Sequence, residues 1–236
     1  HETLQALNQF NIPSKLVEWN SAPDFNQFSG VIIPGGFSYQ DRIRAGVISA
    51  KLDIIKQLKQ HSEKSNIPIL GICNGAQILV ESGLLSLQNT SLSLDAFIDN
   101  NYTSNQLTGF ISDWAFLSTL NPEKSIFLRQ FNKNDVIPIQ ICHGEGKFIT
   151  ATNPTSGLQY CTIDGTVDPQ FPTTPNGSQD ALAGISNATG NVLAIMPHPE
   201  RSLTPSRYPF SIQTWAKKHN VNLVDWSQLF LAFKEN

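Results

Sequence analysis

The chain has little charge and no long apolar run. Only 15% of its 236 residues are charged and the formal net charge is −3, so nothing indicates a nucleic-acid-binding surface. No apolar run approaches the length of a membrane span, and the first residues lack the basic segment and apolar core of a signal peptide. A hydrophobic share of 40% nevertheless predicts a folded chain with a full core.

Cysteine and metal-binding patterns are equally scarce. The three cysteines are Cys73, Cys142 and Cys161, an odd number that suits a reducing compartment, so we expect a cytoplasmic protein. There is no CxxC pair, and the five histidines are not grouped at metal-ligand spacing. A phosphate-binding GxxxxGK[ST] pattern and an acidic cluster for magnesium are also missing. We therefore expect no cofactor and no metal in this chain.

Helical and strand-like segments alternate in the first third of the chain. Helical periodicity occurs at 2–10, 45–59 and 75–85, and strand-like runs occur at 14–19, 29–36 and 67–72. Alternation of this kind predicts a parallel sheet with helices on both faces. We expect an α/β fold, a three-layer α/β/α sandwich with a flavodoxin-like, mostly parallel sheet.

The remainder of the chain differs in character. Short mixed runs between 94 and 148 predict a small antiparallel addition or a flap, and the Pro- and Gly-rich segment 168–180 predicts a loop. Runs at 181–187 and 191–197 predict a β-hairpin, and a last helix is expected at 211–218 or at 226–233. No repeat or linker divides the chain, so we expect residues 1–236 to form a single domain.

The segment "GICNGAQ" places Cys73 between Gly71 and Gly75, where a strand is expected to turn sharply into a helix. Such a turn exposes its central side chain and needs small neighbours on both sides. The amino end of the following helix favours a thiolate, and the N–H of Asn74 would point at an oxygen developing on an attacked carbonyl. These features predict a nucleophile. The alternative is a buried cysteine packed as a small apolar side chain.

A nucleophilic thiol requires a base, and "MPHPER" offers one. His198 lies between two prolines that restrict the backbone, and Glu200 follows two residues later. In an extended segment the two side chains would project to the same side, so Glu200 would orient one ring nitrogen while the other faces Cys73. The alternative is a capped turn with a solvated glutamate.

Several motifs together carry a family resemblance between residues 30 and 201. In chain order they are "PGGFSYQDRIRAG", "GICNGAQIL", "HGEGKF", "TPNGSQDALAGI" and "MPHPER". The chain thereby resembles the class I, triad-type glutamine amidotransferases. More narrowly, it resembles the glutaminase subunits or domains of phosphoribosylformylglycinamidine synthase, the enzyme of purine biosynthesis.

The resemblance implies a role for each matching residue. Cys73 would attack the side-chain amide of L-glutamine to form a thioester, with His198 as base and then acid, and with Glu200 orienting His198. The remaining implied positions are the oxyanion and substrate-binding residues Gly35, Gly36, Asn74, Gln77, His143 and Glu145, and a partner interface at Tyr39, Arg42 and Arg44. The alternative for the interface segment is a solvated loop in which Asp41 pairs with an arginine.

The resemblance also implies a partner. In the family, ammonia passes to a synthetase component, a separate subunit or part of the same polypeptide, which uses ATP and Mg²⁺ to make formylglycinamidine ribonucleotide. Two other classes remain open: another glutamine amidotransferase or cysteine hydrolase of the same broad fold, and a non-catalytic paralogue that serves as a scaffold. We expect no nucleic-acid or membrane partner.

Three features depart from the family pattern. Gln40 stands where the family has glycine, and Asp113 stands where a basic residue is usual. Family members also open with an apolar strand that this sequence does not contain. We expect that strand to belong inside the sheet near the elbow strand, so its absence would leave a gap, and we expect the natural polypeptide to continue upstream of His1.

Overall fold

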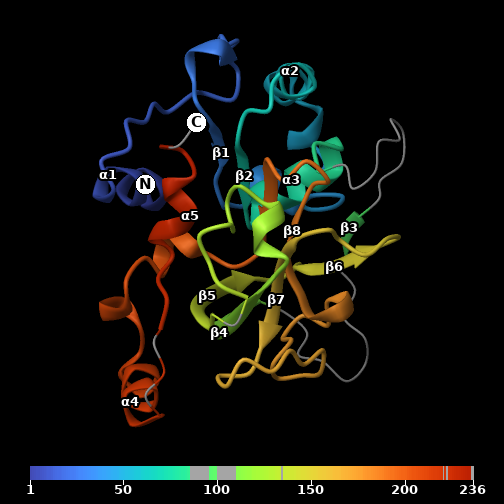
Figure 1. Ribbon diagram of the computed structural model, residues 1–236. Helices are drawn as coiled ribbons and strands as arrows, with labels where there is room; N and C mark the ends of the chain where they lie inside the picture. Colours follow the sequence, from blue (N-terminus) through green and yellow to red (C-terminus); the bar gives the residue numbers. More distant parts are fainter. Residues whose placement is uncertain (86–95, 100–109, 134, 220, 222, 235–236) are drawn as a thin grey trace.

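The computed structural model describes residues 1–85, 96–99, 110–133, 135–219, 221 and 223–234. Its main feature is a seven-stranded sheet, accompanied by a two-stranded one (Figure 1). In spatial order the large sheet contains β1 (Val31–Ile33), β2 (Ile69–Ile72), β9 (Val192–Ile195), β8 (Leu182–Ser186), β7 (Gly157–Cys161), β4 (Ile111–Leu120) and β5 (Ile137–His143). The small sheet pairs β3 (Ala96–Asp99) with β6 (Lys147–Thr150) in antiparallel fashion.

The large sheet is mixed. Strands β1, β2 and β9 are parallel neighbours, whereas β9, β8, β7, β4 and β5 pair antiparallel in that order. The α/β class is confirmed, and the antiparallel part is larger than we expected. The further antiparallel strands are β7, β4 and β5. The predicted β8–β9 hairpin is present, and its tight turn closes with a bond from Gly190 N–H to Asn187 C=O. A turn this short can only join antiparallel strands, because a parallel pair needs a long crossover.

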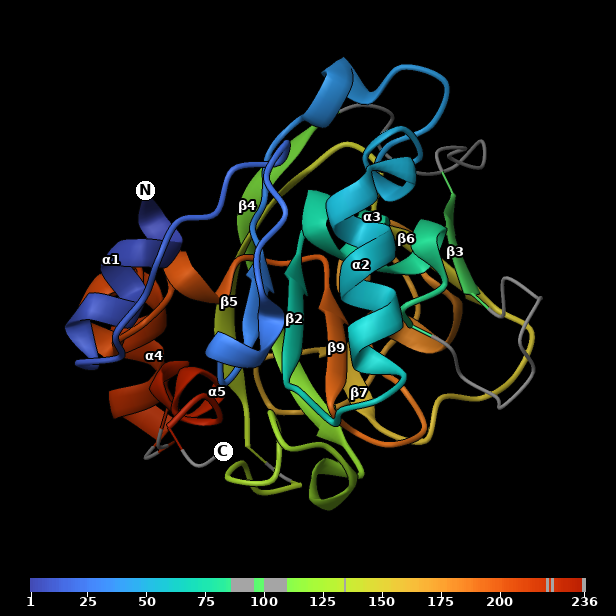
Figure 2. The ribbon, with the colours of Figure 1, turned by 90° about the horizontal axis from the view of Figure 1, so that it is seen from above.

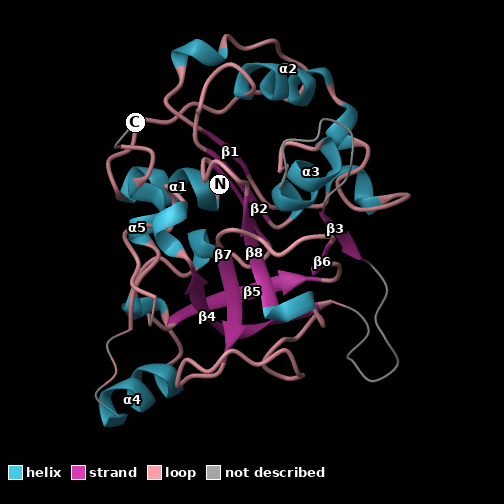
Figure 3. Cartoon of the chain, turned by 45° about the vertical axis from the view of Figure 1, so that its right-hand side comes forward, coloured by secondary structure: helices cyan, strands magenta, loops and turns pink. Residues whose placement is uncertain are grey.

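Helices cover both faces of the sheet (Figure 2). Helices α2 (Asp53–Ser62) and α3 (Asn74–Ser82) lie on one side, and α1 (Glu2–Gln9) and α5 (Ser227–Leu231) lie on the other. Phe230 of α5 stacks on Phe10 just after α1, with ring centroids 6.1 Å apart. The three-layer arrangement is therefore confirmed. Helix α4 (Phe210–His219) lies at the periphery, away from the sheet (Figure 3).

Two expected elements differ in the structure. The predicted strand at 14–19 has no regular structure, and Leu16 and Trp19 are exposed. The helix expected at 45–59 begins only at Asp53, after a 3-10 turn at Ser49–Lys51. The helix cannot start earlier because Leu52 adopts an extended backbone, with φ −64° and ψ 147°. Both alternatives for the last helix are realised, as α4 and α5.

The expected gap beside the elbow strand is absent. Strand β2 is paired on one side with β1 and on the other with β9, and β1 lies at the edge of the sheet. The expected position of a missing strand between paired neighbours was therefore wrong.

The helices in the described ranges are all too short or too polar to cross a bilayer. Within the segment 94–148, predicted as a small antiparallel addition or a flap, residues 94–95, 100–109 and 134 lie outside the described residues.

Candidate active site

The three parallel strands end at the same edge of the sheet. Gly35 follows β1, Cys73 follows β2 and His198 follows β9. The register aligns Ile33 with Gly71 and Ile72 with Ile195, so the segments after the strands emerge side by side. Crevices beyond the carboxyl ends of parallel strands are the usual location of α/β active sites.

Cys73 occupies a strained turn between β2 and α3. Its backbone lies at φ 52° and ψ −109°, a conformation that L-residues rarely adopt, and its N–H donates to the carbonyl of Ile195 at 2.8 Å. Glycine is required at positions 71 and 75 because the neighbouring backbone leaves no room for a side chain there. A Cβ on Gly75 would lie 1.9 Å from the Ile33 carbonyl oxygen, and a Cβ on Gly71 would lie 2.6 Å from the Gly75 carbonyl oxygen. The predicted elbow is therefore present.

His198 is fixed by its backbone and by Glu200. The His198 N–H donates to the Gln140 carbonyl on β5 at 2.8 Å, and His198 Nδ1 lies 2.6 Å from Glu200 Oε1. Our reason for this pairing was wrong, since Pro199–Arg201 forms a 3-10 turn and not an extended segment. Both side chains are 3% exposed, so the pair is shielded from water.

The pKa of His198 is strongly perturbed. Burial lowers it, but the neighbouring Cys73 and Glu200 outweigh burial and raise the pKa to about 10. Within the described residues, Nε2 has no conventional hydrogen-bond partner. With Nδ1 bound to Glu200, Nε2 is the nitrogen available to exchange a proton at Cys73. The raised pKa favours the protonated form of the ring.

Gly35 lies against the side chains of Cys73 and His198. A Cβ at this position would be 2.9 Å from His198 Cε1 and 3.4 Å from Cys73 Cβ. Asn74 is the first residue of α3, so its N–H belongs to the unpaired donors of a helix start. The backbone near Gly35 and Gly36 and the Asn74 N–H are thus placed beside Cys73, as an oxyanion site requires.

Gly35→Ala should lower kcat for amide hydrolysis more than tenfold without unfolding the protein. The added methyl group would displace the His198 ring, and misplacement of a reacting group by a fraction of an ångström is costly to the rate. The measurement is steady-state kinetics with a circular dichroism melt of the same sample. A variant with wild-type kcat would contradict the close approach of Gly35 to the ring.

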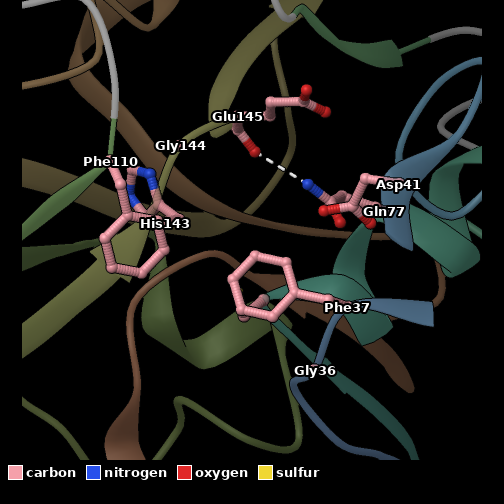
Figure 4. Close-up of a pocket in the computed structure, with 9 residues that line it drawn as sticks. Gly36, Phe37, Asp41, Gln77, Phe110, His143, Gly144 and Glu145 are labelled. Atoms are coloured by element: carbon pink, nitrogen blue, oxygen red, sulfur yellow. Dashed lines mark hydrogen bonds between the residues drawn. The ribbon is translucent and has the colours of Figure 1, made fainter. Parts of the chain in front are cut away.

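A cavity of about 160 Å³ opens in front of Cys73. Figure 4 shows that Asp41 and Glu145 lie on one side in this view, and the rings of Phe37 and Phe110 lie on the other. The residues that line the cavity are Gly36, Phe37, Asp41, Cys73, Gln77, Phe110, His143, Gly144 and Glu145. The predicted substrate-binding positions Gly36, Gln77, His143 and Glu145 therefore share one pocket with the proposed nucleophile.

Gln77 is bound on both sides of its amide. Its Nε2 donates to the Glu145 carbonyl at 2.8 Å, as Figure 4 shows, and its Oε1 accepts from Asn74 Nδ2 at 2.8 Å. The side chain therefore ties the 143–146 segment to α3. This arrangement supports a positioning role, whereas we predicted a direct contact with the substrate.

His143 is buried and uncharged. Burial, with a contribution from the charge of His198, lowers its pKa to about 4. The side chain is 2% exposed, and neither ring nitrogen has a hydrogen-bond partner among the described residues. A neutral imidazole in this position can both donate and accept a hydrogen bond with a bound molecule.

The segment predicted as a partner interface borders the pocket. Tyr39 and Arg42 are exposed, and Arg42 donates to Gln40 Oε1 at 3.0 Å. Arg44 instead pairs with Glu81 of α3 at 2.6 Å. Gln40, the departure from the family glycine, lies at φ 57°, a left-handed conformation that costs a non-glycine residue about 1 kcal/mol. The interface role stays a prediction.

Sequence reasoning missed three pocket residues, Phe37, Asp41 and Phe110. The alternative pairing of Asp41 with an arginine is wrong, because Asp41 Oδ1 faces Asn74 Nδ2 at 3.4 Å. Asp41 lies within the motif that we assigned to the interface. Tyr39, Gln40 and Asp41 all have left-handed backbone conformations. The alternation of polar and apolar residues therefore could not have shown that the Asp41 side chain points into the pocket. Among the described residues, no group of three His, Cys, Asp or Glu side chains could hold a metal ion.

Comparison with known proteins places this geometry in a family. Residues 6–235 match the model of the CobB/CobQ-like glutamine amidotransferase domain. The phosphoribosylformylglycinamidine synthase subunit PurQ of Methanothrix thermoacetophila is 35% identical over 226 residues, which cover 89% of this chain and 84% of that one. The PurQ subunit of Saccharolobus solfataricus is 36% identical over 208 residues, 85% of this chain and 83% of that one.

Comparison with solved structures supports the same family. A chain in the structure of PurLQS from Thermotoga maritima matches with a TM-score of 0.75 and 28% identity, over 99% of this chain and 91% of that one. A glutamine amidotransferase of Methylobacillus flagellatus, 11% identical with a TM-score of 0.51 over 99% of this chain and 88% of that one, shares the fold alone. The chain therefore belongs to the CobB/CobQ-like glutamine amidotransferase domain family, among the PurQ subunits of phosphoribosylformylglycinamidine synthase.

Proposed function

We infer that this chain is the glutaminase component of phosphoribosylformylglycinamidine synthase. The observation that carries this inference is the convergence of Cys73, His198 and Glu200 at one sheet edge, beside a pocket, in a chain of the PurQ family. The chain hydrolyses L-glutamine, and the ammonia that it releases serves an ATP-dependent synthetase component.

The first half of the reaction forms a thioester. The Cys73 sulfur, its proton passed to His198 Nε2, attacks the amide carbon of glutamine, and the carbonyl oxygen becomes an oxyanion beside the Asn74 N–H. Protonated His198, held by Glu200 at 2.6 Å, then gives its proton to the amide nitrogen. The C–N bond breaks, ammonia leaves, and the γ-glutamyl group stays on sulfur.

The second half releases glutamate. His198, now neutral, takes a proton from a water molecule as that water attacks the thioester carbon. The C–S bond breaks, His198 returns the proton to the sulfur and glutamate departs. Glu200 keeps the ring in one orientation through both halves, because it accepts the Nδ1 proton throughout.

The synthetase component supplies the ATP-dependent part of the reaction. We propose that ATP and Mg²⁺ act on that component, where ammonia and formylglycinamide ribonucleotide give the amidine, and that this chain itself uses no cofactor. We further propose that residues 1–236 work as one domain, and that the enzyme works in the cytoplasm, where its three free cysteines stay reduced.

Reconstitution tests the proposal. The purified chain is mixed with a PurL-type synthetase, formylglycinamide ribonucleotide, ATP and Mg²⁺, and amidine formation is measured with glutamine or with ammonium chloride as nitrogen donor. We expect the glutamine-dependent reaction to require this chain and the ammonium-dependent reaction to proceed without it. A synthetase that works with ammonium but gains no glutamine-dependent activity from this chain would exclude the proposed function.

A further inference from the structure

The Pro- and Gly-rich loop at 168–180 carries buried polar side chains that lie outside the active-site pocket. Thr174, Asn176 and Ser178 are at most 3% exposed, and none of them lines the cavity in front of Cys73. Buried polar groups are costly unless they are hydrogen-bonded, so the partners of these side chains show what the loop holds in place.

Asn176 and Ser178 converge on one carbonyl group. Asn176 Nδ2 donates to the Gly146 carbonyl oxygen at 2.6 Å, and Ser178 Oγ donates to the same oxygen at 3.4 Å. Ser178 Oγ also accepts from the Phe148 N–H of β6 at 2.9 Å, and the Ser178 N–H donates to Asn176 Oδ1 at 3.1 Å. The two side chains, called the clamp below, therefore fix the backbone where β6 begins.

Gly146 in turn supports the ring of His143. A Cβ on Gly146 would lie 2.6 to 3.0 Å from three atoms of that ring, so the ring packs directly on this glycine. Neither ring nitrogen has a hydrogen-bond partner among the described residues, so packing holds the ring there. His143 and Glu145, which precede Gly146, both line the cavity (Figure 4). A shift of the Gly146 carbonyl would therefore move one wall of the pocket.

The reacting groups are held independently of the clamp. Cys73 follows β2 and His198 follows β9, whereas the clamp acts on the connection between β5 and β6. The hydrogen bonds that Asn176 and Ser178 form among the described residues reach neither Cys73 nor His198. Loss of the clamp should therefore disturb the pocket wall and leave the nucleophile and its base in place.

We propose that Asn176 and Ser178 are positioning residues for glutamine hydrolysis. They hold the Gly146 carbonyl, and through it the pocket wall formed by residues 143–145, in the conformation that binds the substrate. This inference rests on the proposed glutaminase function. The wall contacts the substrate but forms and breaks no bond, so loss of the clamp should raise KM and leave kcat nearly unchanged.

Asn176→Asp is the sharpest test, because it keeps the volume of the side chain and its Oδ1 acceptor but replaces the donor with a carboxylate oxygen. Near pH 8 we expect KM for glutamine about tenfold above the wild-type value, with kcat within about twofold. A protonated carboxyl group can donate to the Gly146 carbonyl again, so the ratio of variant to wild-type KM should fall as the pH is lowered toward about 5.5. The measurement is ammonia release from glutamine in the reconstituted mixture with the synthetase.

Alkylation by iodoacetamide reports on the nucleophile separately, since this reagent is not an amino acid and does not need the pocket wall. Cys73 should be alkylated at the wild-type rate in Asn176→Asp, as followed by peptide mass. Asn191→Ala is the matched control. Asn191 is also buried, and its Nδ2 donates to the Ile67 carbonyl at 3.1 Å, at the end of β9 opposite to His198. This control should be less stable than wild-type protein but keep the wild-type KM.

A wild-type KM for Asn176→Asp at every pH would overturn the proposal. A loss of kcat with slower alkylation of Cys73 would also overturn it, since the clamp would then act on the whole site. If Asn176→Asp does not fold, Ser178→Ala must raise KM in its place. A wild-type KM for Ser178→Ala, or failure of both variants to fold, would assign the clamp to stability alone. Failure of the proposed function looks different, because wild-type protein would then release no ammonia from glutamine.

Discussion

Cys73→Ala should lower glutamine hydrolysis by at least about 10⁴-fold, because no other group in the pocket can form the thioester. The fold should persist, since alanine fills most of the space of a cysteine that is 7% exposed. Diazo-oxonorleucine, a reactive glutamine analogue, should add once to the wild-type protein and not to the variant. Ammonia release and intact mass are the two measurements.

The matched control for this prediction is Cys161→Ala. Cys161 lies on β7, and burial, aided by the charge of Asp164 and opposed by a hydrogen bond with Ser118, raises the pKa of its thiol to about 12. It is therefore an unreactive thiol at neutral pH. Cys161→Ala should still form the diazo-oxonorleucine adduct and should hydrolyse glutamine at the wild-type rate. Labelling of Cys73→Ala, or residual hydrolysis near the wild-type rate, would remove Cys73 from the mechanism.

Glu200→Gln should lower kcat roughly 10²–10⁴-fold and lower the pKa of His198 from about 10. The amide keeps the shape of the side chain but removes the charge that stabilises the imidazolium. The pKa can be followed by NMR titration of the His198 Cε1 proton. Glu2→Gln, which breaks only the 2.9 Å contact with Arg201, is the control and should change neither quantity.

The same pair predicts a pH dependence of stability. Because the folded pKa of His198 lies above its ordinary value of 6.5, its stabilising contribution is complete below about pH 6.5 and is lost as pH rises through about 10. The wild-type free energy of unfolding should therefore fall by up to a few kcal/mol across this window. Denaturant unfolding at several pH values should show a flatter profile for Glu200→Gln. Identical profiles would mean that the carboxylate does not hold the charged ring.

Local rules predicted the catalytic elbow well. Gly71 and Gly75 flank Cys73 because a side chain at either position would meet backbone atoms within 3 Å, a steric demand that adjacent residues reveal. The pairing of His198 with Glu200 was also predicted, although for the wrong backbone geometry. A separation of two residues limits the possible contacts strongly enough that the error in conformation did not matter.

Contacts between distant segments were not predictable in the same way. The assignment of Gln77 to substrate contact did not anticipate that both ends of its amide are bound by Glu145 and Asn74. Arg44, assigned to an interface, pairs with Glu81, and Asp41 turns into the pocket. The directions of Arg44 and Asp41 depend on a left-handed loop, which alternation of polar and apolar residues does not encode, and the Gln77 contact joins segments 68 residues apart.

The sequence by itself determined the α/β class, the strand–nucleophile–helix turn and the position of the base with its carboxylate. These depend on backbone sterics and side-chain spacing within a few residues. Only the tertiary structure decided that five of the seven strands form an antiparallel run, and that Asp41 and Glu145 share one pocket. The reason is that strand pairing and pocket electrostatics arise from segments far apart in the chain, whose meeting is set by packing of the whole fold.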